Sequence, residues 1–183
     1  MIPEIPVNGL TLILGGARSG KSSFAEKIAH DSGKSVLYIA TATAGDDEMA
    51  ERIRNHQASR PAQWQTLECP LNVGRRLDVP RGEVVIVDCI TLLVSNILFS
   101  FPEDTPAETV MHKVRVEMED LIGAQSRIGG QWLVVSNEVG LGLVPPYPQG
   151  RIYRDVLGRA NQILAQAASR VILMVAGIPM VVK

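Results

Sequence analysis

Residues 10–23, LTLILGGARSGKSS, combine an apolar run, a glycine-rich turn and the start of a helical pattern. Within this segment, Gly15, Gly20, Lys21 and Ser22 have the spacing of a phosphate-binding loop (P-loop). In such a loop, backbone N–H groups and the positive end of the next helix bind phosphates, the lysine reaches the β and γ oxygens, and the hydroxyl ligates Mg²⁺. Glycines let the backbone curl around the anion through φ values that a Cβ would penalise. The motif therefore predicts a strand, a nucleotide-binding loop and a helix, in that order.

Short apolar runs alternate with amphipathic stretches along the rest of the chain. Strands are predicted at 35–40, 64–69, 83–88, 132–136 and 170–176, and helices at 46–57, 71–77, 91–100, 107–125 and 151–168. Such alternation, with right-handed crossovers, gives a mostly parallel sheet with helices on both faces. We therefore expect an α/β fold of three layers, α/β/α, like that of P-loop NTPases. Residues 1–9 are expected to be a loose N-terminal lead-in, and residues 10–183 a single nucleotide-binding catalytic domain.

Composition and charge argue against several other classes of protein. A net charge of −1 and the absence of a basic run disfavour a nucleic-acid surface, which needs clustered Lys and Arg. No apolar run approaches the roughly 20 residues needed to span a bilayer. Cys69 and Cys89 lack the spacing of metal ligands, and no signal peptide is apparent ahead of them. We therefore expect reduced thiols in a cytoplasmic protein.

Polar residues follow two of the predicted strands, at the edge where ligands collect in open α/β sheets. Thr41, Ala42 and Thr43 come directly after the strand at 35–40. Asp88 ends the apolar strand at 83–88, which is a Walker-B-like position from which a carboxylate can hold Mg²⁺ or its water beside the P-loop hydroxyl of Ser22. The sequence therefore predicts a phosphate and metal site made of Lys21, Ser22 and Asp88.

The three histidines give a weaker indication. His56 lies near the end of the helix predicted at 46–57, on one face with Arg52 and Ile53. A lone histidine on a mixed helical face is usually a surface or core residue, so the residues alone leave its role open. His30, at the back of the P-loop helix, and His112, on a charged helix, are not expected to take part in the chemistry.

Taken together, many stretches of the chain resemble one enzyme family. They are GGARSGKS at 15–22, YIAT at 38–41, DEM at 47–49, Arg52-Ile53, His56, Arg60-Pro61, Trp64, Glu68-Cys69, DCIT at 88–91, NEVG at 137–140, Arg154-Asp155, GRANQ at 158–162 and GIP at 177–179. The family is the bifunctional adenosylcobinamide kinase / adenosylcobinamide-phosphate guanylyltransferase of cobalamin biosynthesis. The resemblance covers nearly the whole chain from about Leu10 onward, and it is far more specific than the P-loop alone.

The resemblance implies two reactions. The enzyme phosphorylates the aminopropanol hydroxyl of adenosylcobinamide with ATP or GTP, and then transfers GMP from GTP to that phosphate through a guanylylated histidine, releasing pyrophosphate. By match to the family, His56 is that nucleophile and Lys21 is the other catalytic residue. A neutral imidazole suits attack at the α-phosphorus, because its pKa of about 6.5 leaves most of it unprotonated at neutral pH. The family also implies a homotrimer with sites between subunits. The expectation of Mg²⁺ comes from the P-loop hydroxyl and Asp88, and that of no nucleic-acid partner comes from the charge.

Matching residue by residue gives the expected GTP site. It comprises Gly15, Gly16, Ala17, Arg18, Ser19, Gly20, Lys21, Ser22, Thr41, Ala42, Thr43, Gln57, Ala58, Ser59, Arg60, Glu68 and Asp88, with Ser22 and Asp88 as metal ligands. Arg60 either forks onto phosphate oxygens or is a surface arginine. Glu68 either accepts hydrogen bonds from guanine or ribose, or forms a salt bridge at a strand end. Asp88 stands where some members carry glutamate, which leaves metal and nucleoside binding both open.

Acceptor binding is less well defined by the sequence. Asn137 and Glu138 serve the acceptor hydroxyl or Mg²⁺, or Glu138 is structural. Arg151, Arg154 and Arg159 face a corrinoid phosphate or form a solvated face. The segment 140–150 holds three glycines and three prolines, which is typical of a functional loop.

Two other functions are compatible with the P-loop alone. One is a kinase for another small hydroxylated substrate, with His56 only structural. The other is a nucleotide-dependent switch or ATPase subunit with a protein partner. Both predict nucleotide turnover without an adduct on histidine, so a test of His56 separates them from the bifunctional transferase.

Overall fold

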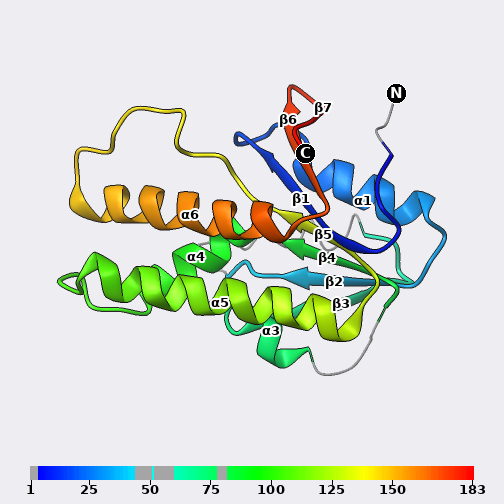
Figure 1. The fold of residues 1–183 in the computed structure, drawn as a ribbon, viewed down its shortest axis with the longest axis horizontal. Helices are drawn as coiled ribbons and strands as arrows, with labels where there is room; N and C mark the ends of the chain where they lie inside the picture. Colours follow the sequence, from blue (N-terminus) through cyan, green and yellow to red (C-terminus); the bar gives the residue numbers. More distant parts are fainter. Residues whose placement is uncertain (1–3, 44–50, 52–59, 78–81) are drawn as a thin grey trace.

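The computed structural model describes residues 4–43, 51, 60–77 and 82–183, and these build one sheet with helices packed on it (Figure 1). The strands are β1 (Gly9–Gly15), β2 (Val36–Ala40), β3 (Gln65–Glu68), β4 (Val84–Asp88), β5 (Gln131–Val135), β6 (Arg170–Val175) and β7 (Ile178–Val181). Their spatial order is β3-β2-β4-β5-β1-β6-β7. β1 to β6 are parallel, and β7 is antiparallel to β6.

Helices cover both faces of the sheet. α1 (Lys21–Asp31) packs on one face, where its apolar side meets alternate residues of β2 and β4. The other face carries α3 (Val73–Arg76), α4 (Ile90–Phe99), α5 (Ala107–Ile128) and α6 (Pro148–Ala167). Figure 1 shows α5 and α6 lying along one another on this face. The predicted three-layer α/β/α fold with a mostly parallel sheet is therefore confirmed.

Burial on both faces explains why the central strands are continuous apolar runs. β2 and β5 are buried at every position, as expected of parallel strands covered on two sides. In β2, Leu37 and Ile39 face α4 and α5, while Val36, Tyr38 and Ala40 face α1. Among the described helices, none has both the length and the apolar character needed to cross a membrane.

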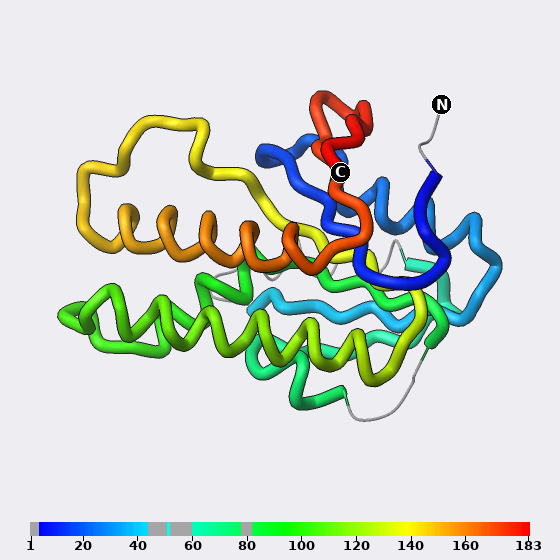
Figure 2. The backbone as a smooth tube through the Cα atoms, viewed as in Figure 1, coloured from blue at the N-terminus to red at the C-terminus, as the bar shows by residue number. Residues whose placement is uncertain are grey.

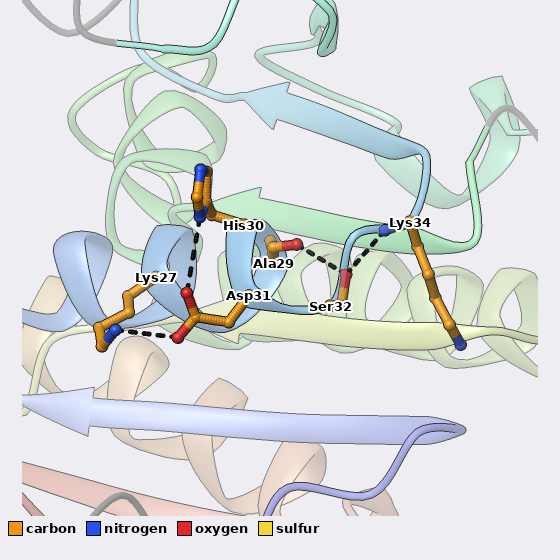
Figure 3. Close-up of polar contacts among 6 residues, drawn as sticks. All are labelled: Lys27, Ala29, His30, Asp31, Ser32 and Lys34. Atoms are coloured by element: carbon orange, nitrogen blue, oxygen red, sulfur yellow. Dashed lines mark hydrogen bonds and ion pairs between the residues drawn. The ribbon is translucent and has the colours of Figure 1, made fainter.

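The end of α1 shows how a helix is closed by local chemistry (Figure 3). Ser32 Oγ donates to the carbonyl oxygen of Ala29 at 2.6 Å and accepts from the Lys34 N–H at 3.2 Å. Gly33 follows with φ 65°, the left-handed conformation that commonly ends a helix. His30 lies 3.5 Å from the Asp31 carboxylate, at the end of α1 away from the P-loop.

Two differences from the sequence-based prediction lie in the C-terminal part of the chain. α6 begins at Pro148 rather than at residue 151, because proline fits the first turn of a helix, where its missing N–H is not needed. The loop predicted at 140–150 is correspondingly shorter. The last strand, predicted at 170–176, is followed by an antiparallel partner, β7, which was not predicted.

A tight turn joins β6 to β7 and brings this hairpin to the P-loop. Ala176 and Gly177 have φ values of 50° and 81°, as in the turns that suit the twist of a hairpin. The Gly177 N–H donates to the carbonyl oxygen of Ser19 at 3.0 Å. Figure 2 shows this red hairpin beside the blue loop that follows β1.

Candidate active site

The site lies at the carboxyl edge of the sheet, where four strands end side by side. The register aligns Ala40 of β2, Asp88 of β4 and Val135 of β5, and β5 lies between β4 and the P-loop strand β1. A cavity of about 470 Å³ opens there. Of the predicted nucleotide-binding residues, it is lined by Ala17, Arg18, Ser19, Gly20, Lys21, Ser22, Ala42, Arg60 and Asp88. The structure therefore brings the P-loop, Asp88 and Arg60 to one cavity.

Two glycines of the P-loop are required by the backbone. Gly20 has φ 92°, and Gly15 has φ 152°. A Cβ on Gly15 would lie 2.6 Å from both the Met174 carbonyl oxygen and Ser19 Oγ. Neither position accepts a larger side chain without strain. This close packing fixes the loop between β6 and α1.

Lys21 is held inside the P-loop. Its side chain is buried, and Nζ donates to the carbonyl oxygen of Gly16 at 2.6 Å, with Ser19 Oγ at 3.4 Å. Burial lowers the pKa of Lys21, whereas Cys89, when its thiol is ionised, and Asp88 oppose that shift. Lys21 therefore lines the cavity, with its ammonium group held by the loop backbone.

Asp88 accepts hydrogen bonds from two hydroxyl groups. Ser22 Oγ donates to Oδ1 at 3.2 Å, and Tyr38 Oη donates to Oδ2 at 2.5 Å. Burial is the main reason why the pKa of Tyr38 lies well above its usual value, and the Asp88 charge adds to it. Burial also raises the pKa of the neighbouring Cys89 thiol to about 11, so this thiol stays protonated at neutral pH. Cys69 and Cys89 are both free, as predicted.

Arg60 lies over the ring of Tyr38, with Cζ 3.6 Å from the ring centroid. Its Nε and Nη1 atoms are buried and have no hydrogen-bond acceptor among the described residues. Arg60 also lines the cavity. Two guanidinium donors beside the cavity are therefore left without a described acceptor, and a phosphate group could supply one.

Thr41, Thr43 and Glu68 lie at the same edge of the sheet but outside the cavity lining, as do Gly15 and Gly16 of the P-loop. Thr41 is fully buried; its hydroxyl donates to the Cys89 carbonyl oxygen at 2.7 Å and accepts from the Cys89 N–H at 2.8 Å. Thr43 Oγ1 lies 3.3 Å from Asn96 Oδ1. Glu68 ends β3, and β2 separates this strand from Asp88. Thr41 thus ties the end of β2 to the start of α4.

The sequence analysis missed three residues that shape this edge: Tyr38, Asn96 and Asn161. Asn96 Nδ2 donates to the carbonyl oxygens of Thr41 at 2.8 Å and Pro70 at 3.1 Å, and so joins two loops to α4. The buried Asn161 donates to the Asn137 carbonyl oxygen at 3.0 Å and accepts from Ser136 Oγ at 2.7 Å. A polar residue on the inner side of an otherwise apolar helix was the available signal.

Of the described residues considered for binding the acceptor substrate, Asn137 lines the cavity and the others do not. Asn137 lines the cavity, and its N–H donates to Thr91 Oγ1 at 2.7 Å. Glu138 Oε1 accepts from the Gly140 N–H at 2.6 Å. Arg151 donates to the carbonyl oxygens of Pro145 and Pro146 at 3.1 and 2.8 Å. Arg154 and Arg159 contact Asp155 and Gln162 on their own helix, at 3.7 and 3.0 Å.

Four predicted residues lie outside the described part of the chain: His56, Gln57, Ala58 and Ser59. The helix predicted at 46–57 lies outside it as well, apart from Glu51. The roles assigned to these residues stay predictions.

The chain is similar to known proteins over almost its whole length. The family model described as cobinamide kinase / cobinamide phosphate guanyltransferase matches residues 11–182. The chain is 45% identical over 174 residues to the bifunctional adenosylcobalamin biosynthesis protein CobP of Pseudomonas aeruginosa, covering 94% of this chain and 96% of that protein. It is 40% identical over 181 residues to CobU of Escherichia coli, covering 95% and 99%.

A solved structure supports the fold alone. The flagellar accessory protein FlaH from Methanocaldococcus jannaschii superimposes with a TM-score of 0.51 at 16% identity, covering 98% of this chain and 80% of that chain. The sequence matches extend over almost the full length of both partners, and the P-loop cavity lies within them. The chain therefore belongs to the cobinamide kinase / cobinamide phosphate guanylyltransferase family.

Proposed function

We propose that the cavity between the P-loop and Asp88 is the nucleotide site for both reactions of this enzyme. The chain is a bifunctional cobinamide kinase and cobinamide phosphate guanylyltransferase of adenosylcobalamin biosynthesis. The observation that carries the proposal is the convergence of the Lys21 ammonium, the Ser22 hydroxyl and the Asp88 carboxylate on one cavity. These groups are the set needed to bind a nucleoside triphosphate.

In the kinase reaction, the acceptor hydroxyl of adenosylcobinamide attacks the γ-phosphorus of ATP or GTP. The bond between the β–γ bridging oxygen and the γ-phosphorus breaks, and the nucleoside diphosphate leaves. The Lys21 ammonium stabilises the negative charge that develops on the γ-phosphoryl oxygens and on the leaving group. The hydroxyl proton passes to a base or to solvent. Asn137 lies at the end of the strand between β1 and β4 and is our candidate for contact with the acceptor.

The oxygens of Ser22 and Asp88 fit a Mg²⁺ ion. They lie 3.2 Å apart, and Mg²⁺ at nucleotide sites prefers a few protein oxygens together with water and phosphate oxygens. The described residues hold no cluster of three or more His, Cys, Asp or Glu side chains suited to a metal, and a P-loop site does not need one. Bound there, Mg²⁺ would neutralise phosphate charge. Ser22 and Asp88 would orient it.

In the guanylyltransferase reaction, a neutral His56 imidazole nitrogen attacks the α-phosphorus of GTP. A P–N bond forms, and the bond to the leaving pyrophosphate breaks. A phosphate oxygen of adenosylcobinamide phosphate then attacks the same phosphorus, the P–N bond breaks, and adenosylcobinamide-GDP is released with His56 regenerated. The free donors of Arg60 are suited to hold phosphate oxygens during both steps.

The position of Arg60 supports this role for His56. Arg60 follows His56 by four residues in the sequence, and Arg60 lines the cavity. The trimer and the cytoplasmic location expected from the resemblance stay predictions.

The test is to incubate the protein with Mg²⁺ and GTP labelled at the α-phosphorus, and to challenge the protein-bound label with acid and with base. A phosphoramidate on histidine is labile in acid and survives base. We expect acid-labile label on the wild type and on His112→Ala, and none on His56→Ala. His112 is the matched control because it is a second histidine, 3.0 Å from Arg115 on α5.

Retained label on His56→Ala would contradict the assigned nucleophile. Hydrolysis of GTP with no label on the wild type would contradict guanylyl transfer through histidine. It would instead favour a simple kinase or a nucleotide-dependent switch.

A further inference from the structure

Tyr38 takes no part in the proposed chemistry, yet it contacts two groups that line the nucleotide cavity. It lies in the middle of β2, and its side chain is 1% exposed. Its ring packs among the apolar residues between the sheet and α1. A tyrosine hydroxyl buried this deeply needs a hydrogen-bond partner, because an unpaired hydroxyl inside a protein is costly. The partner it finds is Asp88.

The hydrogen bond from the Tyr38 hydroxyl restricts rotation of the Asp88 carboxylate. The carboxylate torsion of an aspartate is broad, so a single hydrogen bond leaves its plane poorly defined. Ser22 Oγ donates to Oδ1 at 3.2 Å, and Tyr38 Oη donates to the other oxygen, Oδ2, at 2.5 Å. With both oxygens engaged, the plane of the carboxylate is fixed relative to the P-loop.

The ring of Tyr38 fixes a second group. Arg60 Cζ lies 3.6 Å from the ring centroid, well inside the range of a cation–π contact. Stacking uses the flat face of the guanidinium and leaves the N–H groups in its plane free to bind an anion. Arg60 Nε and Nη1 are buried and lack acceptors among the described residues, as this arrangement requires. Arg60 thus lines the cavity and carries two donors that no described residue uses.

We propose that Tyr38 is a positioning residue for nucleotide binding, whose hydroxyl directs the Asp88 carboxylate and whose ring seats the Arg60 guanidinium. The inference rests on the proposed function, because it takes the cavity as the nucleotide site. Asp88 ends β4 and Arg60 precedes β3, so one side chain sets the spacing between two separate segments. Through Asp88, the Tyr38 hydroxyl affects the part of nucleotide binding that depends on Mg²⁺. Through Arg60, the ring affects the part that does not.

The experiment measures equilibrium binding of a fluorescent, non-hydrolysable GTP analogue, first in EDTA and then across a Mg²⁺ titration. Tyr38→Phe keeps the ring and removes the hydroxyl. We expect the half-saturating Mg²⁺ concentration to rise about tenfold, as for loss of a hydrogen bond to a charged group, while Kd in EDTA stays within about twofold. Circular dichroism and the thermal midpoint establish that each variant is folded.

The ring is tested by placing pentafluorophenylalanine at position 38 and comparing it with Tyr38→Phe. The two rings are similar in size, but fluorination reverses the charge on the ring face. We expect Kd in EDTA to weaken about threefold to tenfold, as for loss of a cation–π contact. Arg60→Met should abolish this difference between the two rings, because the interacting partner is gone.

Each part of the inference has an outcome that overturns it. Unchanged Mg²⁺ dependence in Tyr38→Phe overturns the role of the hydroxyl. Equal Kd values for the two rings, or a difference that persists in Arg60→Met, overturn the role of the ring. A purely structural defect would weaken binding equally with and without Mg²⁺, and would also overturn the assignment. Because the assay requires no adduct, failure of the His56 labelling test leaves this result interpretable by itself.

Discussion

The Ser22 hydroxyl lies 3.2 Å from the Asp88 carboxylate, although 66 residues separate them in the sequence. Ser22 is in the first turn of α1, and Asp88 is the last residue of β4. β5 lies between β1 and β4, so α1 reaches across it to bring the P-loop hydroxyl to the neighbouring strand end. Sheet order therefore decides which carboxylate meets the P-loop.

Replacing this carboxylate should impair both reactions. Asp88→Asn keeps the shape of the side chain and an acceptor for Tyr38, but removes the negative charge opposite Ser22. We expect kcat/KM of each reaction to fall about 100-fold, as for loss of one transition-state contact. Separate assays of phosphorylation and guanylyl transfer, at a fixed Mg²⁺ concentration, measure this. Wild-type rates in a folded Asp88→Asn protein would contradict the assignment.

Substitutions at Lys21 and His56 should affect the two reactions differently. Lys21→Ala removes the ammonium buried in the P-loop, and we expect at least about a 100-fold loss in both reactions, because both use the triphosphate. His56→Ala should abolish guanylyl transfer and leave kinase turnover substantially intact. Product analysis with adenosylcobinamide and GTP distinguishes the two steps. Equal loss of both reactions in folded His56→Ala would count against this division of roles.

Gly74 should be intolerant of substitution for a steric reason. A Cβ at this position in α3 would overlap the backbone carbonyl group of Asp120 in α5. We expect Gly74→Ala to lower the free energy of unfolding by about 3 kcal/mol, as overpacking does. Gly123→Ala in α5 is the matched control, since nothing lies within 4 Å of its Cβ.

The control should be neutral, or stabilising by up to about 1 kcal/mol, because alanine favours helix more than glycine does. Urea denaturation measures both variants. A similar small effect at Gly74 and Gly123 would show that α3 and α5 are less closely packed than described.

Glu117 should make stability depend on pH. It is buried on α5, and its Oε1 accepts from the Val73 N–H at 2.7 Å. Burial raises the pKa of Glu117 above 4.5, although hydrogen bonds from Val73 and Asn72 oppose the shift. Above pH 4.5 the folded state thus keeps a proton that the unfolded chain has lost. The stability from this proton is present below pH 4.5 and is lost as pH rises through the folded-state pKa.

Glu117→Gln removes this titration and keeps an acceptor for Val73. We expect the free energy of unfolding of the wild type to fall, relative to Glu117→Gln, between pH 4.5 and neutrality. Denaturation of both proteins at a series of pH values measures the difference. Parallel pH profiles would contradict the prediction.

The sequence predicted the elements whose signal is local. The P-loop follows from the spacing of a few adjacent residues, and Asp88 from its place at the end of an apolar run. The strands were predictable because burial on two faces makes them continuously apolar. Most boundaries are accordingly within a few residues of those observed.

The contacts between distant segments were not predictable. Tyr38 resembled one more apolar residue of a strand, and only the register with β4 brings its hydroxyl to Asp88. Asn96 gave no signal for the two loops that it joins, because those contacts depend on how α4 packs. β7 was missed because its pairing is set by a turn of two residues with positive φ.

That turn also bears on how the protein is handled in the laboratory. The Gly177 N–H supports the carbonyl oxygen of Ser19, and Gly177 Cα lies 3.4 Å from where a Cβ on Gly20 would be. Truncation of the chain before β7 should therefore weaken triphosphate binding. This effect would be indirect, because none of the described residues after Asn137 lines the cavity. For immobilisation on a sensor surface, attachment far from this hairpin is the better choice.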